Sequence, residues 1–122
     1  MNILIAEDDL TLQTTIKQLM DCWGYACDIA SNGLEVVKRA RQNEGKYDLC
    51  LMDIDMPLMN GFEATKQIRK KTRYLPIMAL TGHENMHRKC ADSGMDDFLE
   101  KPYNARTLYN KINKLRKNMR RC

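Results

Sequence analysis

The amino-acid sequence predicts an α/β fold in which a parallel sheet of five strands is flanked by five helices. Short apolar runs of strand length alternate along the chain with segments whose apolar residues recur at helical spacing. Residues that start and stop helices stand between the two kinds of segment. This order of elements is typical of a parallel sheet wrapped by the helices that join its strands.

The apolar runs identify the strands. In chain order they are Asn2–Ala6, Tyr25–Ala30, Tyr47–Asp53, Pro76–Leu80 and Met95–Leu99. The helical segments between and after these runs place their apolar residues on one face. The clearest examples are Leu12, Ile16, Leu19, Met20 and Trp23, and then Leu108, Ile112, Leu115 and Met119.

Three turn signals agree with this division into strands and helices. Asn32 followed by Glu35 fits a capping box at the start of a helix. Asn60-Gly61 fits a turn that leads into a helix, and Gly24 fits a helix stop. We therefore expect helix boundaries close to these residues.

Length and composition favour one soluble domain that comprises residues 1–122. The chain is 43% hydrophobic and 30% charged, which is ordinary for a soluble globular protein. No apolar run approaches the ~20 residues that a membrane span needs. The first residues carry no secretion signal. We therefore expect a cytoplasmic protein without a membrane partner.

Reactive side chains follow four of the five predicted strands. Residues Glu7–Asp9 follow the first strand, and Asp53 ends the third. Thr81 follows the fourth strand, and Lys101 comes shortly after the fifth. Ligands of an open parallel sheet bind beyond the carboxyl ends of its strands. We therefore expect these side chains to meet at one edge of the sheet.

Carboxylates that gather at a sheet edge repel one another unless a cation lies among them. Mg²⁺ is the expected cation, or Mn²⁺, because both prefer hard oxygen ligands such as carboxylates and water. Asp8 and Asp53 would supply carboxylate oxygens. The backbone carbonyl of Asp55 would supply another ligand, and Glu7 would order a metal-bound water.

The same cluster predicts phosphoryl transfer to an aspartate. A carboxylate can accept a phosphoryl group if its oxygen faces the donor in line, and Asp53 has that position. The transfer needs positioning and charge neutralisation more than acid or base chemistry. Lys101 would neutralise phosphoryl oxygens opposite the metal, and the Thr81 hydroxyl would donate a hydrogen bond to another oxygen.

At these residues the chain resembles the receiver domain of two-component response regulators, over essentially its full length. The motifs that it shares with that family, in the same order and spacing, are E-D-D from Glu7, D-x-D-M-P-x-M-N-G from Asp53, T-G from Thr81 and F-L-E-K-P from Phe98. The resemblance implies a doubly wound, flavodoxin-like sheet with strand order 2-1-3-4-5. It also implies magnesium-dependent phosphotransfer from a histidine kinase or a histidine phosphotransfer protein.

The resemblance further implies a switch rather than an enzyme. The domain would catalyse only its own phosphorylation and dephosphorylation. The phosphoryl group would draw in Thr81, and Phe98 would change rotamer. A downstream effector would then bind the face formed by the last helix and the helix and strand before it, where we expect Phe98, Tyr103 and Tyr109 to cluster.

Two residues depart from the family pattern in ways that affect this switch. Phe98 stands where the family often has tyrosine, so it can repack but cannot form the hydrogen bond of a hydroxyl. Asp55 places an acid two residues after the acceptor, near the path of an attacking water. We expect Asp55 to alter the lifetime of the phosphoryl group.

Two other classes of function fit parts of the sequence. Asp53-x-Asp55 with a later threonine and lysine also resembles the nucleophile motif of haloacid-dehalogenase-type phosphatases, but their nucleophile ends the first core strand and Asp53 ends the third. Residues 105–122 carry seven basic residues and no acid, a charge pattern that would also suit a nucleic-acid-binding helix. A solvated helix face, with cations near its C-terminal dipole, explains this run better.

Each candidate residue also has an ordinary structural explanation when it is considered alone. Residues 7–9 and Thr81 can cap helices, and Lys101 can be a solvated surface lysine. Their coincidence at four strand ends favours the functional interpretation. His83 and His87, four residues apart on a predicted helix, are expected to be exposed rather than to bind metal.

Overall fold

The computed structural model describes residues 1–72 and 75–119, and strands and helices alternate along it as the sequence predicts. In chain order the elements are β1(Asn2–Ala6), α1(Leu10–Trp23), β2(Ala26–Ala30), α2(Gly33–Gln42), β3(Leu49–Asp53), α3(Gly61–Arg69), β4(Ile77–Thr81), α4(His87–Ser93), β5(Asp97–Glu100) and α5(Ala105–Met119). Arg120 and Arg121, the last members of the predicted basic run, lie outside the described residues. Within the described residues, no helix is both long enough and apolar enough to cross a membrane.

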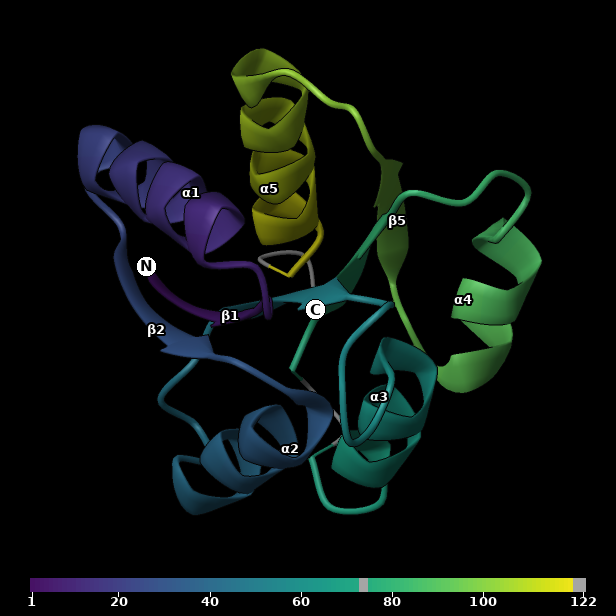
Figure 1. Ribbon diagram of the computed structural model, residues 1–122. Helices are drawn as coiled ribbons and strands as arrows, with labels where there is room; N and C mark the ends of the chain where they lie inside the picture. Colours follow the sequence, from purple (N-terminus) through teal and green to yellow (C-terminus); the bar gives the residue numbers. More distant parts are fainter. Residues whose placement is uncertain (73–74, 120–122) are drawn as a thin grey trace.

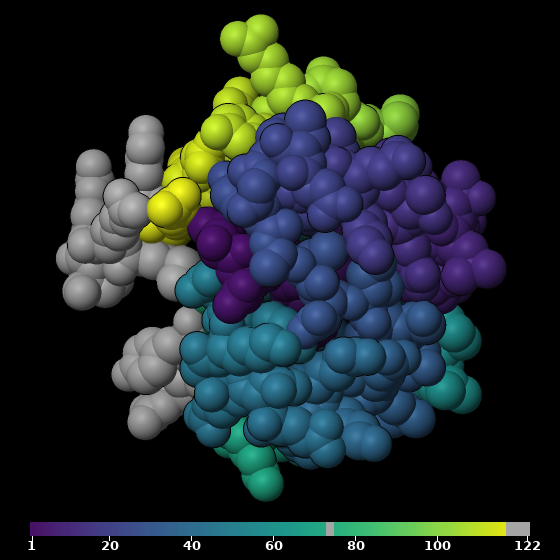
Figure 2. Space-filling model, turned by 90° about the vertical axis from the view of Figure 1, so that its left-hand side faces the viewer, coloured from purple at the N-terminus to yellow at the C-terminus, as the bar shows by residue number. Residues whose placement is uncertain are grey.

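The five strands form one sheet in the order β2-β1-β3-β4-β5, with every neighbouring pair parallel. Figure 1 shows α1 and α5 on one face of this sheet and α2, α3 and α4 on the other. The doubly wound fold and its strand order are therefore confirmed. Figure 2 looks onto the edge where β2 lies, and α1 and α2 flank that strand there.

Strands β2, β3, β4 and β5 begin one or two residues later than predicted. For β2 and β5 the reason is that a helix cap uses a preceding residue. The amide of Tyr25 donates to the Met20 carbonyl, as part of the turn that closes α1. In the same way, the amide of Met95 donates to the Cys90 carbonyl at the end of α4. Both caps contain a left-handed glycine, and Gly24 has φ +76°, so this predicted helix stop is confirmed.

The predicted helix starts are also confirmed by side-chain caps. The Asn32 side chain accepts a hydrogen bond from the Glu35 amide at 2.8 Å, and the Asn60 side chain accepts one from the Glu63 amide at 2.9 Å. The Glu35 carboxylate completes its capping box through the amide of Ser31 rather than that of Asn32. These caps satisfy amides that a helix start leaves without partners.

Both faces of the central strands are buried, so polar side chains reach solvent only at the strand ends. One apolar core lies under α2, α3 and α4 and includes Leu4 and Met52, whereas the other lies under α1 and α5 and includes Ile5 and Leu51. The two cores alternate along each strand because successive side chains point to opposite faces. This burial confines the reactive chemistry to an edge of the sheet.

Gly61 holds the segment after Asp53 against the end of β3. Its amide donates to the Ile54 carbonyl at 2.8 Å. A Cβ atom at this position would overlap the Asp53 carbonyl oxygen and would lie 2.9 Å from the Ile54 Cα atom. A side chain larger than hydrogen would therefore push α3 away from the strand that carries Asp53.

We expect Gly61→Ala to lower the free energy of unfolding by about 1–3 kcal/mol, the usual cost of overpacking a close contact. Chemical denaturation followed by circular dichroism measures this change. Gly82→Ala is the matched control, because a Cβ atom at Gly82 would meet no other atom within 4 Å. Equal unfolding free energies for the two variants would contradict the close packing at Gly61.

Candidate functional site

The acidic residues predicted to meet at the carboxyl edge of the sheet do meet there. Carboxylate oxygens of Glu7, Asp8 and Asp53 all lie within 4.8 Å of one another. Glu7 is 1% exposed and Asp53 is 5% exposed, whereas Asp8 is exposed to solvent. The strands that carry them are neighbours, since β1 pairs with β3. The sheet order thus brings residues from distant parts of the chain into one acidic cleft.

Asp9, the third acidic residue after β1, caps a helix. The Asp9 side chain accepts hydrogen bonds from the amides of Thr11 and Leu12, at 2.8 and 3.1 Å, and caps α1. The Glu7 carboxylate in turn accepts the amide of Asp9 at 3.2 Å. The helix-cap explanation is therefore correct for Asp9, while Glu7 and Asp8 remain directed at the cleft.

Lys101 lies against the two buried carboxylates. Its Nζ atom is 3.4 Å from Glu7 Oε1 and 3.4 Å from Asp53 Oδ1. The amide of Lys101 donates to the Thr81 carbonyl at 2.6 Å, so the end of β4 fixes the backbone from which the lysine reaches. The ammonium group thus lies beside the acidic residues at the carboxyl edge of the sheet, as the sequence predicted.

Burial and charge shift the titration of this cluster. Loss of solvent around Glu7, helped by the Asp53 charge, raises the pKa of Glu7 to about 7, against the opposing effects of the Asp9 amide and Lys101. Burial by itself lowers the pKa of Lys101, but the nearby Asp53 and Glu7 carboxylates outweigh burial and raise the pKa. The lysine therefore stays positively charged beside a carboxyl group that resists ionisation.

Thr81 ends β4 beside the acidic cleft and is completely buried. Its hydroxyl oxygen accepts a hydrogen bond from the His83 amide at 3.0 Å, which leaves the hydroxyl hydrogen free to be donated. Leu80, the residue before it, is in register with Asp53 across the β3–β4 pair. Thr81 therefore lies at the level of the cleft on the strand next to Asp53.

Asp55 and His83 form a contact that the sequence did not predict. His83 Nε2 lies 2.7 Å from Asp55 Oδ2, and both side chains are at least half exposed. The sequence placed His83 on a helix with His87, which is wrong for His83, because α4 begins at His87. Both histidines are exposed as expected. The four-residue spacing of the two histidines is that of one helix turn, but His83 lies in the loop before α4, where its ring meets Asp55.

Phe98 lies in β5 between side chains from two helices. The His87 ring stacks on it at 5.8 Å between centroids, and Lys111 Nζ lies 5.2 Å from its centroid. Lys111 Nζ also donates to the Phe98 carbonyl at 2.7 Å. In this structure Phe98 therefore packs toward α4 and α5 and is half-buried.

The expected cluster of Phe98 with Tyr103 and Tyr109 is not formed. Phe98 packs against the core under α2, α3 and α4, whereas Tyr103 packs against the core under α1 and α5. The Tyr109 ring instead lies 5.0 Å from the Trp23 ring. The sheet separates the two cores, so aromatic residues close in sequence are divided between its faces.

The cleft has the chemistry of a divalent-cation site. Three carboxylates face one ammonium group, so the cluster has room for additional positive charge. Carboxylate oxygens, one of them on an exposed residue, are the ligands that a hard cation with retained waters requires. The same ammonium and the Thr81 hydroxyl can neutralise and hydrogen-bond an anion that enters beside Asp53.

Comparison with known proteins places these residues in context. The family model of the response regulator receiver domain matches residues 3–113. The chain is 37% identical over 120 residues to hybrid signal transduction histidine kinase I of Dictyostelium discoideum. That match covers 91% of this chain but only 7% of the length of the kinase.

Two solved structures show similar folds. The receiver domain of a sensor histidine kinase from Pseudomonas aeruginosa, which has a magnesium ion coordinated in its active site cleft, gives a TM-score of 0.85 at 31% identity, covering 93% of this chain and 95% of that one. The receiver domain of the Saccharomyces cerevisiae response regulator Ssk1, crystallised with the histidine phosphotransfer protein Ypd1, gives a TM-score of 0.86 at 30% identity, covering 94% and 88%.

The raised pKa of Glu7 predicts a pH dependence of stability in metal-free protein. Between about pH 4.5 and 7 the folded protein holds a proton on Glu7 that the unfolded chain has lost, so the free energy of unfolding falls as pH rises. We expect the fall to be up to about 3 kcal/mol, from the size of the pKa shift. Denaturation series at several pH values, with a chelator present, measure it.

Glu7→Gln should remove this part of the pH dependence, since glutamine stays neutral throughout the range. The exposed Glu44→Gln serves as the control and should keep the slope of the wild type. An unchanged slope in Glu7→Gln would show that Glu7 ionises normally in the folded protein.

Proposed function

The chain belongs to the response regulator receiver domain family, and on that premise we propose that it is a phosphorylation switch whose phosphoryl acceptor is Asp53. One observation carries the proposal: the buried Asp53 carboxylate lies within 4.8 Å of carboxylate oxygens of Glu7 and Asp8 and 3.4 Å from the Lys101 ammonium group. Both cores share one sheet, which supports the view that residues 1–122 act as a single receiver domain.

Mg²⁺, or Mn²⁺ in its place, is the proposed cofactor. Asp8 and Asp53 would supply carboxylate ligands, the Asp55 backbone carbonyl would supply another, and Glu7 would bind through a water. When bound, the cation would offset the negative charge that the carboxylates share with an entering phosphoryl group. The magnesium ion in the similar Pseudomonas aeruginosa receiver domain supports this choice.

The chain's own residues position the acceptor and neutralise the charge that is transferred. An Asp53 oxygen would attack the phosphorus atom of a phosphohistidine on the donor protein. The bond from phosphorus to the imidazole nitrogen would break, and its electron pair would leave with the imidazole. Lys101, already 3.4 Å from Asp53, would then face the new phosphoryl oxygens. The buried Thr81 hydroxyl would turn its free hydrogen toward another of these oxygens.

The donor that we propose is a phosphohistidine on a kinase or a phosphotransfer protein. An apolar groove of about 520 Å³ lies between α1 and the segment that joins β5 to α5, and it includes Ile16, Lys101 and Tyr103. Because Lys101 belongs to both the groove and the acidic cleft, a protein seated in the groove would bring a histidine close to Asp53. The Ypd1 complex of the similar yeast receiver supports this class of partner.

The signal would leave through the face formed by α4, β5 and α5. Movement of Thr81 toward the phosphoryl group would free space for Phe98, which must leave His87 and Lys111 in order to turn inward. Phe98 has no hydroxyl, so contacts of its ring alone would stabilise the inward rotamer. We propose that a downstream effector protein or domain binds this face after the change.

A switch accounts for the site better than a haloacid-dehalogenase-type phosphatase. Asp53 ends the third strand of the chain, whereas the nucleophile of that class ends the first core strand. The Asp55 carboxylate, which would have to act as acid and base in such an enzyme, contacts His83 instead. We propose that the domain catalyses only its own phosphorylation and dephosphorylation, in the cytoplasm, without direct binding of nucleic acid.

Incubation with acetyl phosphate and Mg²⁺ should add the mass of one phosphoryl group, which hydroxylamine should remove, because an acyl phosphate forms on a carboxylate. Asp53→Asn should show no gain in mass, and neither should wild-type protein with a chelator. Asp55→Asn is the matched control and should still be phosphorylated, since its side chain points to His83. Intact-protein mass spectrometry makes the measurement. A phosphorylated Asp53→Asn variant would exclude Asp53 as the acceptor.

Lys101→Ala should accept a phosphoryl group but transmit the change poorly, because the lysine both stabilises the new charge and links it to the end of β4. Phosphorylation should move the amide NMR signals of Thr81 and Phe98 in the wild type and move them several-fold less in this variant. Lys70→Ala, at the exposed end of α3, should respond as the wild type does. Wild-type shifts in phosphorylated Lys101→Ala would refute this role.

A further inference from the structure

The ring of Phe98 lies between one side chain from each of the two helices beside β5. The His87 ring, at the start of α4, stacks on it with 5.8 Å between centroids and 27° between the ring planes. The Lys111 ammonium nitrogen, from α5, lies 5.2 Å from the Phe98 centroid. Figure 1 shows α4 and α5 on opposite faces of the sheet, with β5 between them. Because β5 is an edge strand, side chains from both helices can reach the same ring.

Lys111 is fixed near this ring by two hydrogen bonds. Its Nζ atom donates to Asp97 Oδ1 at 3.1 Å and to the Phe98 carbonyl at 2.7 Å. The same Asp97 oxygen accepts the Phe98 amide at 2.8 Å. The Lys111 side chain is 31% exposed and that of Asp97 is 20% exposed, so solvent screens this ion pair less than it screens a fully exposed pair. The ammonium group is therefore anchored at a defined position beside the ring.

Phe98 lies on the same face of the sheet as Thr81. Phe98 is in register with Ala79 across the β4–β5 pair, and Thr81 is two residues beyond Ala79 on β4. Cross-strand partners point to the same face, and so do residues that are two apart on one strand. A change at Thr81 can therefore reach Phe98 along one face, without crossing the sheet.

We propose that His87 and Lys111 form a clamp that holds Phe98 in its present rotamer and thereby opposes the switch. The inference rests on the function proposed above, in which the ring turns inward once Asp53 carries a phosphoryl group. Stacking with an aromatic ring and attraction to a cation both favour the present position, and a ring turned away from both helices would lose both contacts. Neither residue belongs to the acidic cleft, so both are positioning residues that act through Phe98.

Opening the clamp should also make Asp53 easier to phosphorylate. If phosphorylation favours the inward ring, then the inward ring favours phosphorylation by the same factor, because the two equilibria are linked. A variant that populates the inward ring before phosphorylation therefore removes part of the cost of switching. The clamp would thus set the level of donor at which the domain responds.

Scalar couplings of the Phe98 Cγ atom to its backbone nitrogen and carbonyl carbon measure the χ1 rotamer populations in isotope-labelled full chain. The protein is unphosphorylated and kept free of metal, and Phe62, the other phenylalanine, is the internal reference. Lys111→Met keeps the length of the side chain without its charge or its hydrogen bonds. We expect it to raise the minor rotamer of Phe98 about threefold, the effect of losing one exposed cation–π contact. Lys111→Arg keeps the cation and should stay near the wild-type populations.

His87→Ala should have a similar effect from the α4 side, whereas His87→Tyr, which keeps a ring for stacking, should not. Lys114→Met and Arg88→Ala are the matched controls, since both residues are exposed on the same two helices. With a limiting amount of acetyl phosphate and Mg²⁺, Lys111→Met should also be phosphorylated about threefold more than the wild type. Intact-protein mass spectrometry measures this gain, and Lys114→Met should show none.

Wild-type rotamer populations in Lys111→Met and His87→Ala would overturn the proposal, and so would an equal change in Lys114→Met. A changed rotamer in Lys111→Met without a gain in phosphorylation would separate the clamp from the switch and would also overturn it. If acetyl phosphate does not modify the wild type, the function proposed for Asp53 fails, whereas the couplings of the unphosphorylated protein decide the clamp independently.

Discussion

The structure depends on the placement of two nearly buried carboxylates, Glu7 and Asp53, against the single ammonium group of Lys101. Buried carboxylates are costly to ionise unless positive charge lies beside them. One lysine cannot balance Glu7, Asp53 and the nearby Asp8. Burial, helped by the Asp53 charge, raises the pKa of Glu7. A cleft with unbalanced negative charge favours a divalent cation. That cation, together with Lys101, would offset the further negative charge of a phosphoryl group on Asp53.

The sheet makes this charge arrangement possible without exposing the core. Strands β1, β3 and β4 are buried on both faces, so their side chains can become polar only where the strands end. The parallel order β2-β1-β3-β4-β5 brings the carboxyl ends of four strands to the same edge. Asp9 caps α1 there, and Gly61 lets α3 begin against β3, so local structure holds the backbone on both sides of the acids.

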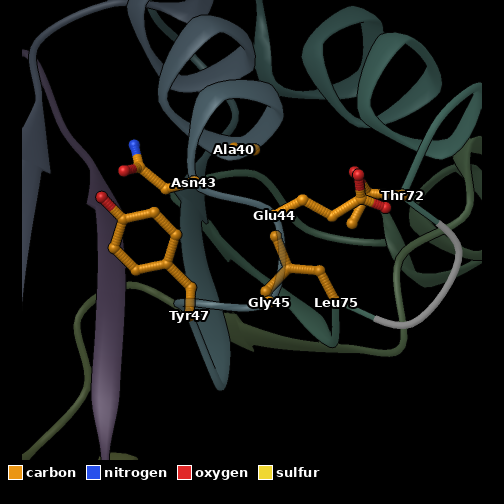
Figure 3. Close-up of a pocket in the computed structure, with 7 residues that line it drawn as sticks. All are labelled: Ala40, Asn43, Glu44, Gly45, Tyr47, Thr72 and Leu75. Carbon is orange, nitrogen blue, oxygen red and sulfur yellow. The ribbon is translucent and has the colours of Figure 1, made fainter.

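The two ends of the sheet then differ in chemistry. The carboxyl edge carries the charged cleft, the exposed contact between Asp55 and His83, and the groove beside Lys101. The amino edge carries a mainly apolar pocket (Figure 3) beside Thr72, whose buried hydroxyl has no hydrogen-bond partner among the described residues. Phe98 lies on the edge strand β5 between α4 and α5, where ring contacts with His87 and Lys111 hold its present position. The family model matches residues 3–113, a range that includes all the residues of the acidic cleft.

The sequence alone determined the order of elements, the helix caps at Asn32 and Asn60, and the four strand ends that carry the cleft, because periodicity and capping are local and parallel strands share an edge. Only the tertiary structure decided which residues meet across long sequence separations. Asp55 contacts His83, 28 residues away, and no local pattern marks that pair. The division of Phe98 and Tyr103 between the two cores, and the unpaired hydroxyl of Thr72, likewise follow from how helices and loops pack on the sheet, a property of the whole fold rather than of any one segment.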